Sequence, residues 1–85
     1  MSELVAQQTC TTLDQLKAGA VGRILQVEGS DGVATRLREM GFIPGMVVRS
    51  IRSAPLGDPL SFLVLGSRVA LRGGEARRIR IVPER

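Results

Sequence analysis

The chain has 85 residues, 44% of them hydrophobic, and 12 basic against 8 acidic residues give a net charge of +4; this length fits one domain with one compact core. A single cysteine, Cys10, and the absence of histidine exclude an internal disulfide, the usual zinc sites and imidazole-based catalysis. The longest uninterrupted apolar run, residues 62–65, is far shorter than the ~20 residues that span a bilayer, and residues 1–12 lack a signal-peptide pattern, so we expect a cytoplasmic protein.

The first part of the chain carries little regular pattern. Residues 1–11 show no sustained apolar periodicity and end in small polar residues, so we expect a loosely ordered N-terminal tail there and one domain over residues 12–85. Thr12 is a candidate N-cap, because its hydroxyl can accept a hydrogen bond from a free backbone N–H. The cap would begin one or two helical turns that end at Gly19.

A first strand and the one long helix follow. Residues 21–28 are rich in aliphatic and β-branched side chains and predict a strand. Its two faces stay ambiguous, because Ile24 and Leu25 are adjacent and a β-bulge is one arrangement that would serve both. The helix is predicted over residues 31–40, where apolar side chains recur at i, i+4 and i+7. Gly41 would end it, since glycine adopts a positive φ without steric cost. The apolar stripe of the helix consists of Val33, Leu37 and Met40, and its cap is Ser30 or Asp31.

After Gly45 the pattern changes to short strands joined by turns. A short hairpin is expected at Gly66, and residues 73–76 predict one 3₁₀ turn with Ala76 inward and Glu75 near its start. Five short strands and one helix in so short a chain favour a mainly β fold, a small closed β-barrel, since closure leaves no exposed sheet edge. The four later strands are predicted over residues 46–53, 60–65, 68–72 and 78–83.

Three ordered segments carry a family pattern. Arg36 and Leu37 precede the run EMGFIPG at residues 39–45, APLGDP follows at 54–59, and ALR at 70–72 precedes a Glu-Ala pair. Together they resemble the FeoA family, the small proteins of bacterial ferrous-iron uptake, over residues 12–82. The resemblance implies an SH3-like β-barrel of about five strands, with one α-helix inserted after the first strand and a short N-terminal helical turn. The matching residues are Arg36, Leu37, Gly41, Phe42, Pro44, Gly45, Pro55, Gly57, Asp58, Pro59, Leu71, Arg72, Glu75 and Ala76.

Most of these motif residues have a structural explanation. The glycines permit turns, the prolines restrict the backbone at turns, and the apolar members pack inside. In the 54–59 turn, Pro59 disfavours a helical conformation at Asp58 and Gly57 allows a tight turn. The expected core comprises Leu37, Phe42, Val48, Phe62, Val64, Leu71, Ile79 and Ile81.

The resemblance also implies an accessory function. FeoA-like proteins work with FeoB, a large membrane transporter with a cytosolic guanine-nucleotide-binding domain. We therefore expect a non-enzymatic regulator that binds this cytosolic region and meets the membrane only through it; self-association stays open. No cofactor or metal site is expected in this chain, although the family is associated with transition-metal ions, because imidazole is absent. Four carboxylates already have cap, turn or surface explanations, namely Glu28, Asp31, Glu39 and Asp58.

Alternation along two neighbouring strands predicts a docking surface. With the core residues inward, four aliphatic side chains point outward on adjacent antiparallel strands, and an exposed apolar patch is typical of an interface. The alternative is that the N-terminal tail covers this face through Leu4 and Val5. The candidate partner-binding residues are Val47, Ile51, Leu63 and Leu65, with Arg49 and Arg52 beside them.

The charge distribution supports a rival function. Residues 1–48 hold four basic and five acidic residues, whereas residues 49–85 hold eight arginines and three acidic residues. A basic half suits nucleic acid, so the alternative is a nucleic-acid-binding small β-barrel that uses this half, with Arg78 and Arg80 as one candidate face. The two phenylalanines are the only aromatic residues and are expected in the core, which leaves no ring for base stacking. We therefore expect no nucleic-acid partner.

Overall fold

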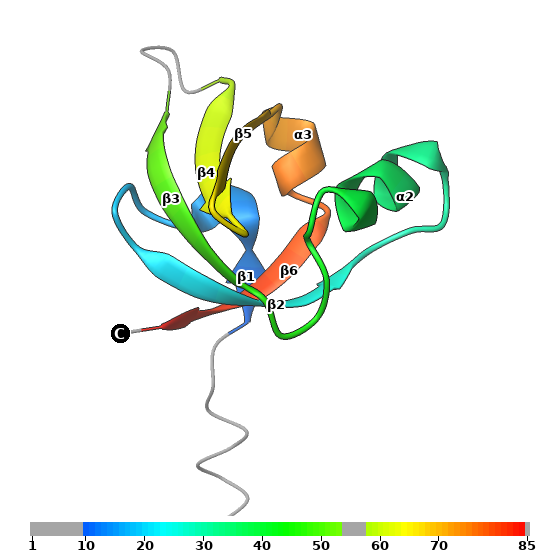
Figure 1. The fold of residues 1–85 in the computed structure, drawn as a ribbon, viewed down its shortest axis with the longest axis horizontal. Helices are drawn as coiled ribbons and strands as arrows, with labels where there is room; N and C mark the ends of the chain where they lie inside the picture. Colours follow the sequence, from blue (N-terminus) through cyan, green and yellow to red (C-terminus); the bar gives the residue numbers. More distant parts are fainter. Residues whose placement is uncertain (1–9, 54–57, 85) are drawn as a thin grey trace, which may run out of the picture.

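One antiparallel sheet dominates the computed structural model, which describes residues 10–53 and 58–84 (Figure 1). Within these residues its strand order is β1-β6-β2-β3-β4-β5. The predicted mainly β, SH3-like class is confirmed, with one strand more than expected. The strands are β1 (Thr11–Thr12), β2 (Val21–Val27), β3 (Val47–Ser53), β4 (Leu60–Val64), β5 (Ser67–Leu71) and β6 (Ile79–Glu84), and the helical segments are η1 (Leu13–Gln15), α2 (Gly32–Glu39) and α3 (Gly73–Ala76).

The sheet does not close into a barrel, so the expectation of full closure was wrong. In the described part of the chain, β1 pairs only with β6 and β5 pairs only with β4. The chain turns helical immediately beyond both edges, into η1 after β1 and into α3 after β5, and these two segments contact each other. Side-chain packing between two helical turns therefore covers the seam that backbone hydrogen bonds leave open.

The sheet begins at Thr11, whose partner on β6 is Ile81. Thr12 does precede η1, but its side chain makes no capping bond and its hydroxyl donates to the Asp14 carboxylate instead. The predicted capping bond was therefore wrong. A two-residue strand has no alternation that sequence periodicity could show, which is why β1 was not foreseen.

Helix α2 follows its predicted pattern closely. The Ala34 backbone N–H donates to Asp31 Oδ1 at 3.1 Å, which makes Asp31 the N-cap. Gly41 follows the helix with φ +111°, and the Phe42 N–H donates back to the Leu37 carbonyl oxygen at 3.2 Å. Ala34 is fully buried and joins Leu37 on the inner face, a core position that the predicted stripe omitted. The helix ends as glycine at C′ predicts.

Two β-bulges and one tight turn set which side chains face outward. The pairing of β2 with β6 shifts between Ile24 and Gln26, and that of β3 with β4 shifts between Ser50 and Arg52. Between β4 and β5 the chain turns over two residues, Leu65 and Gly66, which both have positive φ. Leu65 is thus a turn residue and not the last strand residue that the sequence predicted.

Helix α3 is one α-helical turn, so the predicted 3₁₀ turn was wrong in type. The Arg77 N–H donates to the Gly73 carbonyl oxygen at 2.9 Å, an i→i−4 bond. Glu75 supports the start, because its carboxylate accepts the Arg72 backbone N–H at 3.0 Å. Ala76 is fully buried, as predicted.

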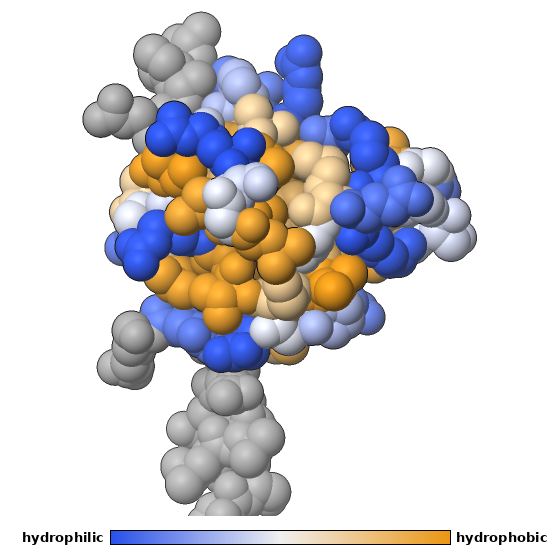
Figure 2. Space-filling view, in the orientation of Figure 1, coloured by the Kyte–Doolittle hydropathy of each residue, from blue (hydrophilic) through white to orange (hydrophobic). Residues whose placement is uncertain are grey.

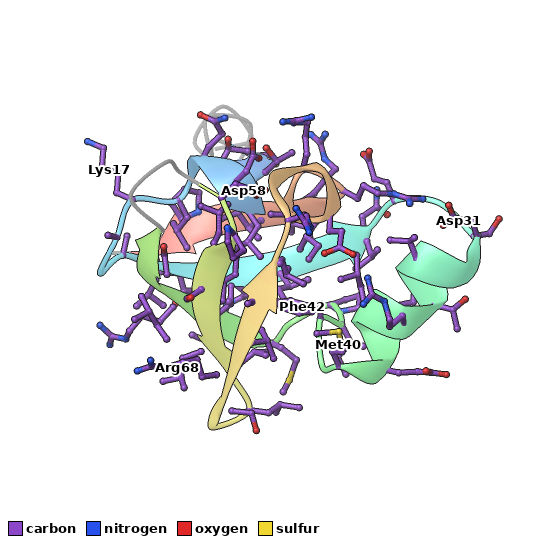
Figure 3. The ribbon with its side chains drawn as sticks, turned by 90° about the horizontal axis from the view of Figure 1, so that it is seen from above. Lys17, Asp31, Met40, Phe42, Asp58 and Arg68 are labelled. Atoms are coloured by element: carbon purple, nitrogen blue, oxygen red, sulfur yellow. The ribbon has the colours of Figure 1, made fainter. Side chains whose placement is uncertain are left out.

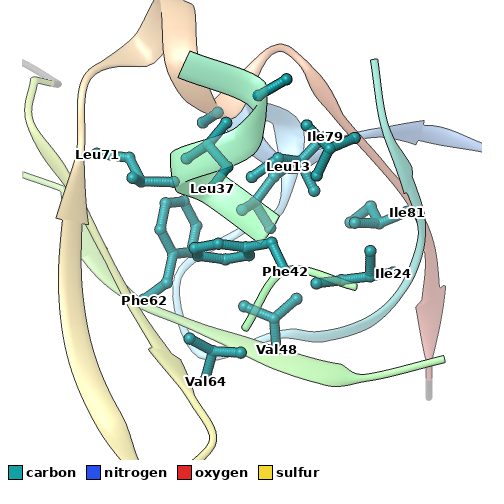
Figure 4. Packing of buried hydrophobic residues seen from close by; sticks show 13 residues of the cluster. Leu13, Ile24, Leu37, Phe42, Val48, Phe62, Val64, Leu71, Ile79 and Ile81 are labelled. Carbon is teal, nitrogen blue, oxygen red and sulfur yellow. The ribbon is translucent and has the colours of Figure 1, made fainter. Parts of the chain in front are cut away.

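The core lies in the concave space of the curved sheet, with α2 across it (Figure 4). All eight residues predicted for the core are buried. Leu13 from η1 and Ile24 from β2 are also large, fully buried side chains. The buried apolar residues among those described are Leu13, Ile24, Val27, Ala34, Leu37, Phe42, Val48, Phe62, Val64, Leu71, Ala76, Ile79 and Ile81.

Candidate docking surface

The convex outer face of β3, β4 and β5 brings one leucine and two arginines into a row. Leu63 on β4 pairs with Arg49 on β3 and with Arg68 on β5. Directly paired residues of antiparallel strands present their side chains on the same face. Because the neighbouring pair Phe62 and Val69 faces the core, this row faces outward, and all three of its residues are exposed.

Aliphatic side chains surround this row. Leu63 is 39% exposed, Val47 on β3 is 44% exposed and Leu65 in the turn is 63% exposed. Figure 2 shows hydrophobic side chains gathered over β3, β4 and the β4–β5 hairpin, with hydrophilic side chains at their border. Ile43, just before β3, is also largely exposed. Large aliphatic side chains grouped in this way on a small domain are typical of a binding surface.

The predicted surface residues are therefore brought together only in part. Val47 and Leu63 face outward on adjacent strands, as alternation predicted. Leu65 lies against Gly41 after α2, where a Cβ on Gly41 would approach Leu65 Cδ1 to 2.7 Å. Ile51 sits at the β3 bulge and is half-buried. Arg52 belongs to β3, but its side chain lies outside the described part, as do the motif residues Pro55 and Gly57 and the tail residues that would cover this face.

Six of the described arginines outside this row face carboxylates of the same chain, whereas Arg38 donates to the backbone carbonyl oxygens of Val27 and Gly29. Arg78 makes a two-pronged contact with Asp31, with Nη2 to Oδ1 at 2.7 Å and Nη1 to Oδ2 at 3.1 Å. Arg80 Nη1 lies 3.5 Å from Glu28 Oε2. The further ion pairs between described residues are Arg23–Glu84, Arg36–Glu75, Arg72–Asp58 and Arg77–Asp14.

The Arg78–Asp31 contact also shifts the titration of both groups. The hydrogen bonds from Arg78, with that from the Ala34 N–H, hold the pKa of Asp31 below its ordinary value. The same carboxylate raises the pKa of Arg78. This contact joins the residue just before β6 to the N-cap of α2, so it links the start of the helix to the sheet.

The two arginines of the outer row differ from these. Neither Arg49 nor Arg68 forms an ion pair with any carboxylate in the described ranges. Arg49 Nη1 donates to the Gly19 carbonyl oxygen at 3.3 Å. Figure 3 shows Arg68 directed away from the interior in which Phe42 lies. As far as residues 10–53 and 58–84 show, the outer row thus presents positive charge without a carboxylate partner on both sides of an aliphatic side chain.

Arg68 is the functional candidate that sequence reasoning missed. A signal was present in the sequence, because a two-residue turn at Leu65 and Gly66 pairs Leu63 with Arg68. Placing Leu65 in the strand instead gave the hairpin a different register. Ile43 was missed for another reason, since it lies in a loop where alternation gives no information.

Two searches of the described residues give negative results. No group of three or more histidine, cysteine, aspartate or glutamate side chains that could hold a metal ion occurs among them. None of the described helices is long and apolar enough to cross a membrane.

Comparison with known families decides the identity of the domain. The family model described as FeoA domain matches residues 11–83. The chain belongs to the FeoA family. The match covers every strand of the sheet, from Thr11 in β1 into β6, so the fold described above is the family domain.

Individual FeoA proteins resemble this chain in sequence and in fold. The FeoA of Stenotrophomonas maltophilia, a prokaryotic SH3 domain protein solved in complex with zinc, is 36% identical with TM-score 0.73, and the match covers 87% of this chain and 89% of that one. The FeoA of Chlorobium tepidum is 31% identical with TM-score 0.82, over 88% of this chain and 71% of that one.

A curated relative links this domain to a transporter. A fusion protein of Fe(2+) transport protein A and the Fe(2+) transporter FeoB from Porphyromonas gingivalis is 33% identical over 69 residues. The match covers 81% of this chain but only 8% of the fusion protein. The FeoA domain and FeoB are therefore parts of one polypeptide in that organism, which ties the family to ferrous-iron transport.

Proposed function

We propose that this FeoA-family chain is a cytoplasmic accessory protein of bacterial ferrous-iron uptake that binds the cytosolic G-domain region of a FeoB-like transporter. The observation that carries the proposal is the fusion of the two proteins in one relative, because covalent linkage keeps two domains at high effective concentration. The role is regulatory and non-enzymatic, and it needs no cofactor or metal site in this chain.

The surface that binds the transporter is the outer face of β3 and β4. It comprises Val47, Ile51, Leu63 and Leu65, with Arg49 and Arg52 on β3. Exposure of Val47, Leu63 and Leu65 supports this choice, since burying one aliphatic side chain contributes roughly 1.5–3 kcal/mol. Several such side chains can dominate a modest interface, while arginines beside them set its orientation.

The test is the double variant Leu63→Ser/Leu65→Ser in a binding assay with the purified cytosolic region of the transporter encoded in the same genome. We expect circular dichroism like that of the parent, since neither residue lies in the core, and loss of binding. Leu25→Ser is the comparison variant, because Leu25 is 38% exposed on β2 and is not one of the proposed binding residues. Unchanged binding by the folded double variant would exclude the surface.

The nucleic-acid alternative has weaker support from the described geometry. Its candidate residues Arg78 and Arg80 face carboxylates of the same chain, and both phenylalanines are buried. Fluorescence anisotropy with a single-stranded oligonucleotide distinguishes the two functions, because phosphate binding weakens steeply as salt rises. Tight, salt-sensitive oligonucleotide binding would favour the alternative.

A further inference from the structure

The outer row has a defined spacing. Arg49, Leu63 and Arg68 lie directly opposite one another on three consecutive strands. Neighbouring strands are ~4.8 Å apart, so the two arginine backbones are separated by about 10 Å with the leucine midway. A ligand that carries two negative groups about 10 Å apart, with an apolar group between them, therefore matches the spacing of these three positions.

An amphipathic α-helix supplies this pattern. A rise of about 1.5 Å per residue places carboxylates at positions i and i+7 about 10.5 Å apart on one helix face. The residues at i+3 and i+4 lie on the same face between those carboxylates and can be aliphatic. The next row of this surface, which holds Val47, offers apolar contact to one side of such a helix.

We propose that the outer face of β3, β4 and β5 binds an acidic amphipathic helix of a partner protein, laid across the strands with one carboxylate at Arg49 and one at Arg68. The helix packs its aliphatic side chains on Leu63 and Val47. This inference builds on the proposed function in one respect: the transporter's cytosolic region is the protein expected to present the helix.

Charge complementarity selects an acidic partner over a second copy of this chain. Two copies related by a twofold axis through this face would place arginines against arginines, and like charges in contact disfavour association. Arg49 pairs with Val21 on β2, and Val21 pairs with Glu84 on β6. The Glu84 carboxylate already faces Arg23, with Nε to Oε2 at 2.6 Å. A different protein is therefore the better source of carboxylates for Arg49 and Arg68, which have no acidic partner among the described residues.

The same residues fit a lipid surface less well. Membrane-interface segments favour tryptophan and tyrosine, and this chain contains neither. Its two phenylalanines are buried in the core. An acidic protein segment therefore accounts for the observed combination of aliphatic and arginine side chains better than anionic lipid does.

The experiment uses a designed peptide of about 18 alanine-based residues, long enough to form helix. It carries glutamates at i and i+7 and leucines at i+3 and i+4, and a matched peptide carries lysines in place of the glutamates. Amide chemical shifts of the full chain are followed during titration. We expect the glutamate peptide to move the amides of Val47 to Arg49, Leu63 and Arg68, and the lysine peptide to leave them unmoved.

Charge-reversed variants sharpen the result. Arg49→Glu/Arg68→Glu should weaken binding of the glutamate peptide roughly tenfold or more, and the variant should bind the lysine peptide instead. If that variant does not fold, Arg49→Gln/Arg68→Gln should weaken binding of the glutamate peptide in the same way without introducing negative charge. Lys17→Glu/Arg72→Glu is the matched control, since it changes the net charge equally at exposed residues outside the row.

Each other outcome overturns the inference. Three results would show that this face does not select an acidic helix. They are no amide shifts at millimolar peptide, equal binding of both peptides, and shifts confined to the free edge of β5. Tight binding to phosphatidylserine vesicles that Leu63→Ser abolishes would assign the face to lipid. If the transporter region binds parent and Arg49→Glu/Arg68→Glu alike, the inference fails and the proposed function stands. If only the peptide binds, the proposed function fails alone.

Discussion

Two groups of arginines in this molecule differ in whether a carboxylate of the same chain lies beside them. On the side where α2 meets β6, Arg78 and Arg80 face Asp31 and Glu28 across elements distant in sequence. On the outer face of β3 to β5, Arg49 and Arg68 flank Leu63 and have no carboxylate partner among the described residues. The same residue type thus joins structural elements in one region and is exposed on the proposed docking surface in the other.

The difference shows why net charge is a poor guide to partners in a small domain. The C-terminal half of the chain is strongly basic in sequence, yet Arg72, Arg77, Arg78 and Arg80 all pair with acidic residues within the fold. Among the arginines of that half whose side chains the structure describes, those without a carboxylate partner are Arg49 and Arg68 on the outer face. Such a surface favours an acidic protein with apolar side chains over a bare phosphate backbone.

The largest expected effect comes from the core that both regions share. Phe62 on β4 is buried next to the exposed Leu63, so Phe62→Ala should lower the free energy of unfolding by about 3–5 kcal/mol. That is a large part of the stability of so small a domain. Urea unfolding followed by circular dichroism measures it. Leu63→Ala is the control and should cost less than ~1 kcal/mol; equal costs would show that the two faces of β4 are reversed.

Alternation and helical periodicity sufficed to predict the strands, the helix and the core that support both groups of arginines. The strand that ends at Ser53, the helix around Leu37 and all eight proposed core residues follow from which positions are apolar. These patterns are local, and each is reinforced by many buried contacts, so tertiary structure had little reason to override them. A register shift does lie at Ile24, but the reason given for it was wrong, since Leu25 is 38% exposed and only Ile24 of the two faces the core.

What the sequence could not supply was pairing between distant residues. The ion pair of Asp31 with Arg78 depends on the route of the chain between α2 and β6, and no local pattern encodes it. The role of Arg68 depended on a turn at Leu65, a residue type that rarely adopts positive φ. The candidate surface was therefore predicted as a set of outward side chains, while its row of charges emerged only from the register.

A smaller effect is expected at Gly41, which follows α2 and lies against Leu65 of the outer face. Its φ of +111° strains any residue with a Cβ, so Gly41→Ala should cost roughly 1–2 kcal/mol. The close approach to Leu65 adds little, because that side chain is 63% exposed and can move away. Thermal unfolding measures the loss. Gly32→Ala, where a Cβ meets nothing within 4 Å, is the control; equal midpoints for both variants would contradict the backbone argument.

The smallest expected effect tests the paired arginines themselves. Arg78→Gln removes the two-pronged contact to Asp31 and should lower the thermal midpoint at neutral pH by less than Phe62→Ala does. Arg80→Gln is the matched comparison and should change the thermal midpoint less still. The contact that it removes, between Arg80 and Glu28, is single, exposed and 3.5 Å long. Scanning calorimetry of the parent and both variants measures the order of the three midpoints.

The pH dependence of that difference identifies the Asp31 carboxylate as its source. Because Arg78 holds the pKa of Asp31 below its ordinary value, the pair stabilises the fold above that value and loses its contribution as pH falls through the lower, folded-state pKa. The gap between parent and Arg78→Gln should thus be constant near neutral pH, shrink below about pH 4, and vanish when Asp31 is protonated. A gap that persists unchanged at lower pH would mean that Arg78 acts through packing and not through Asp31.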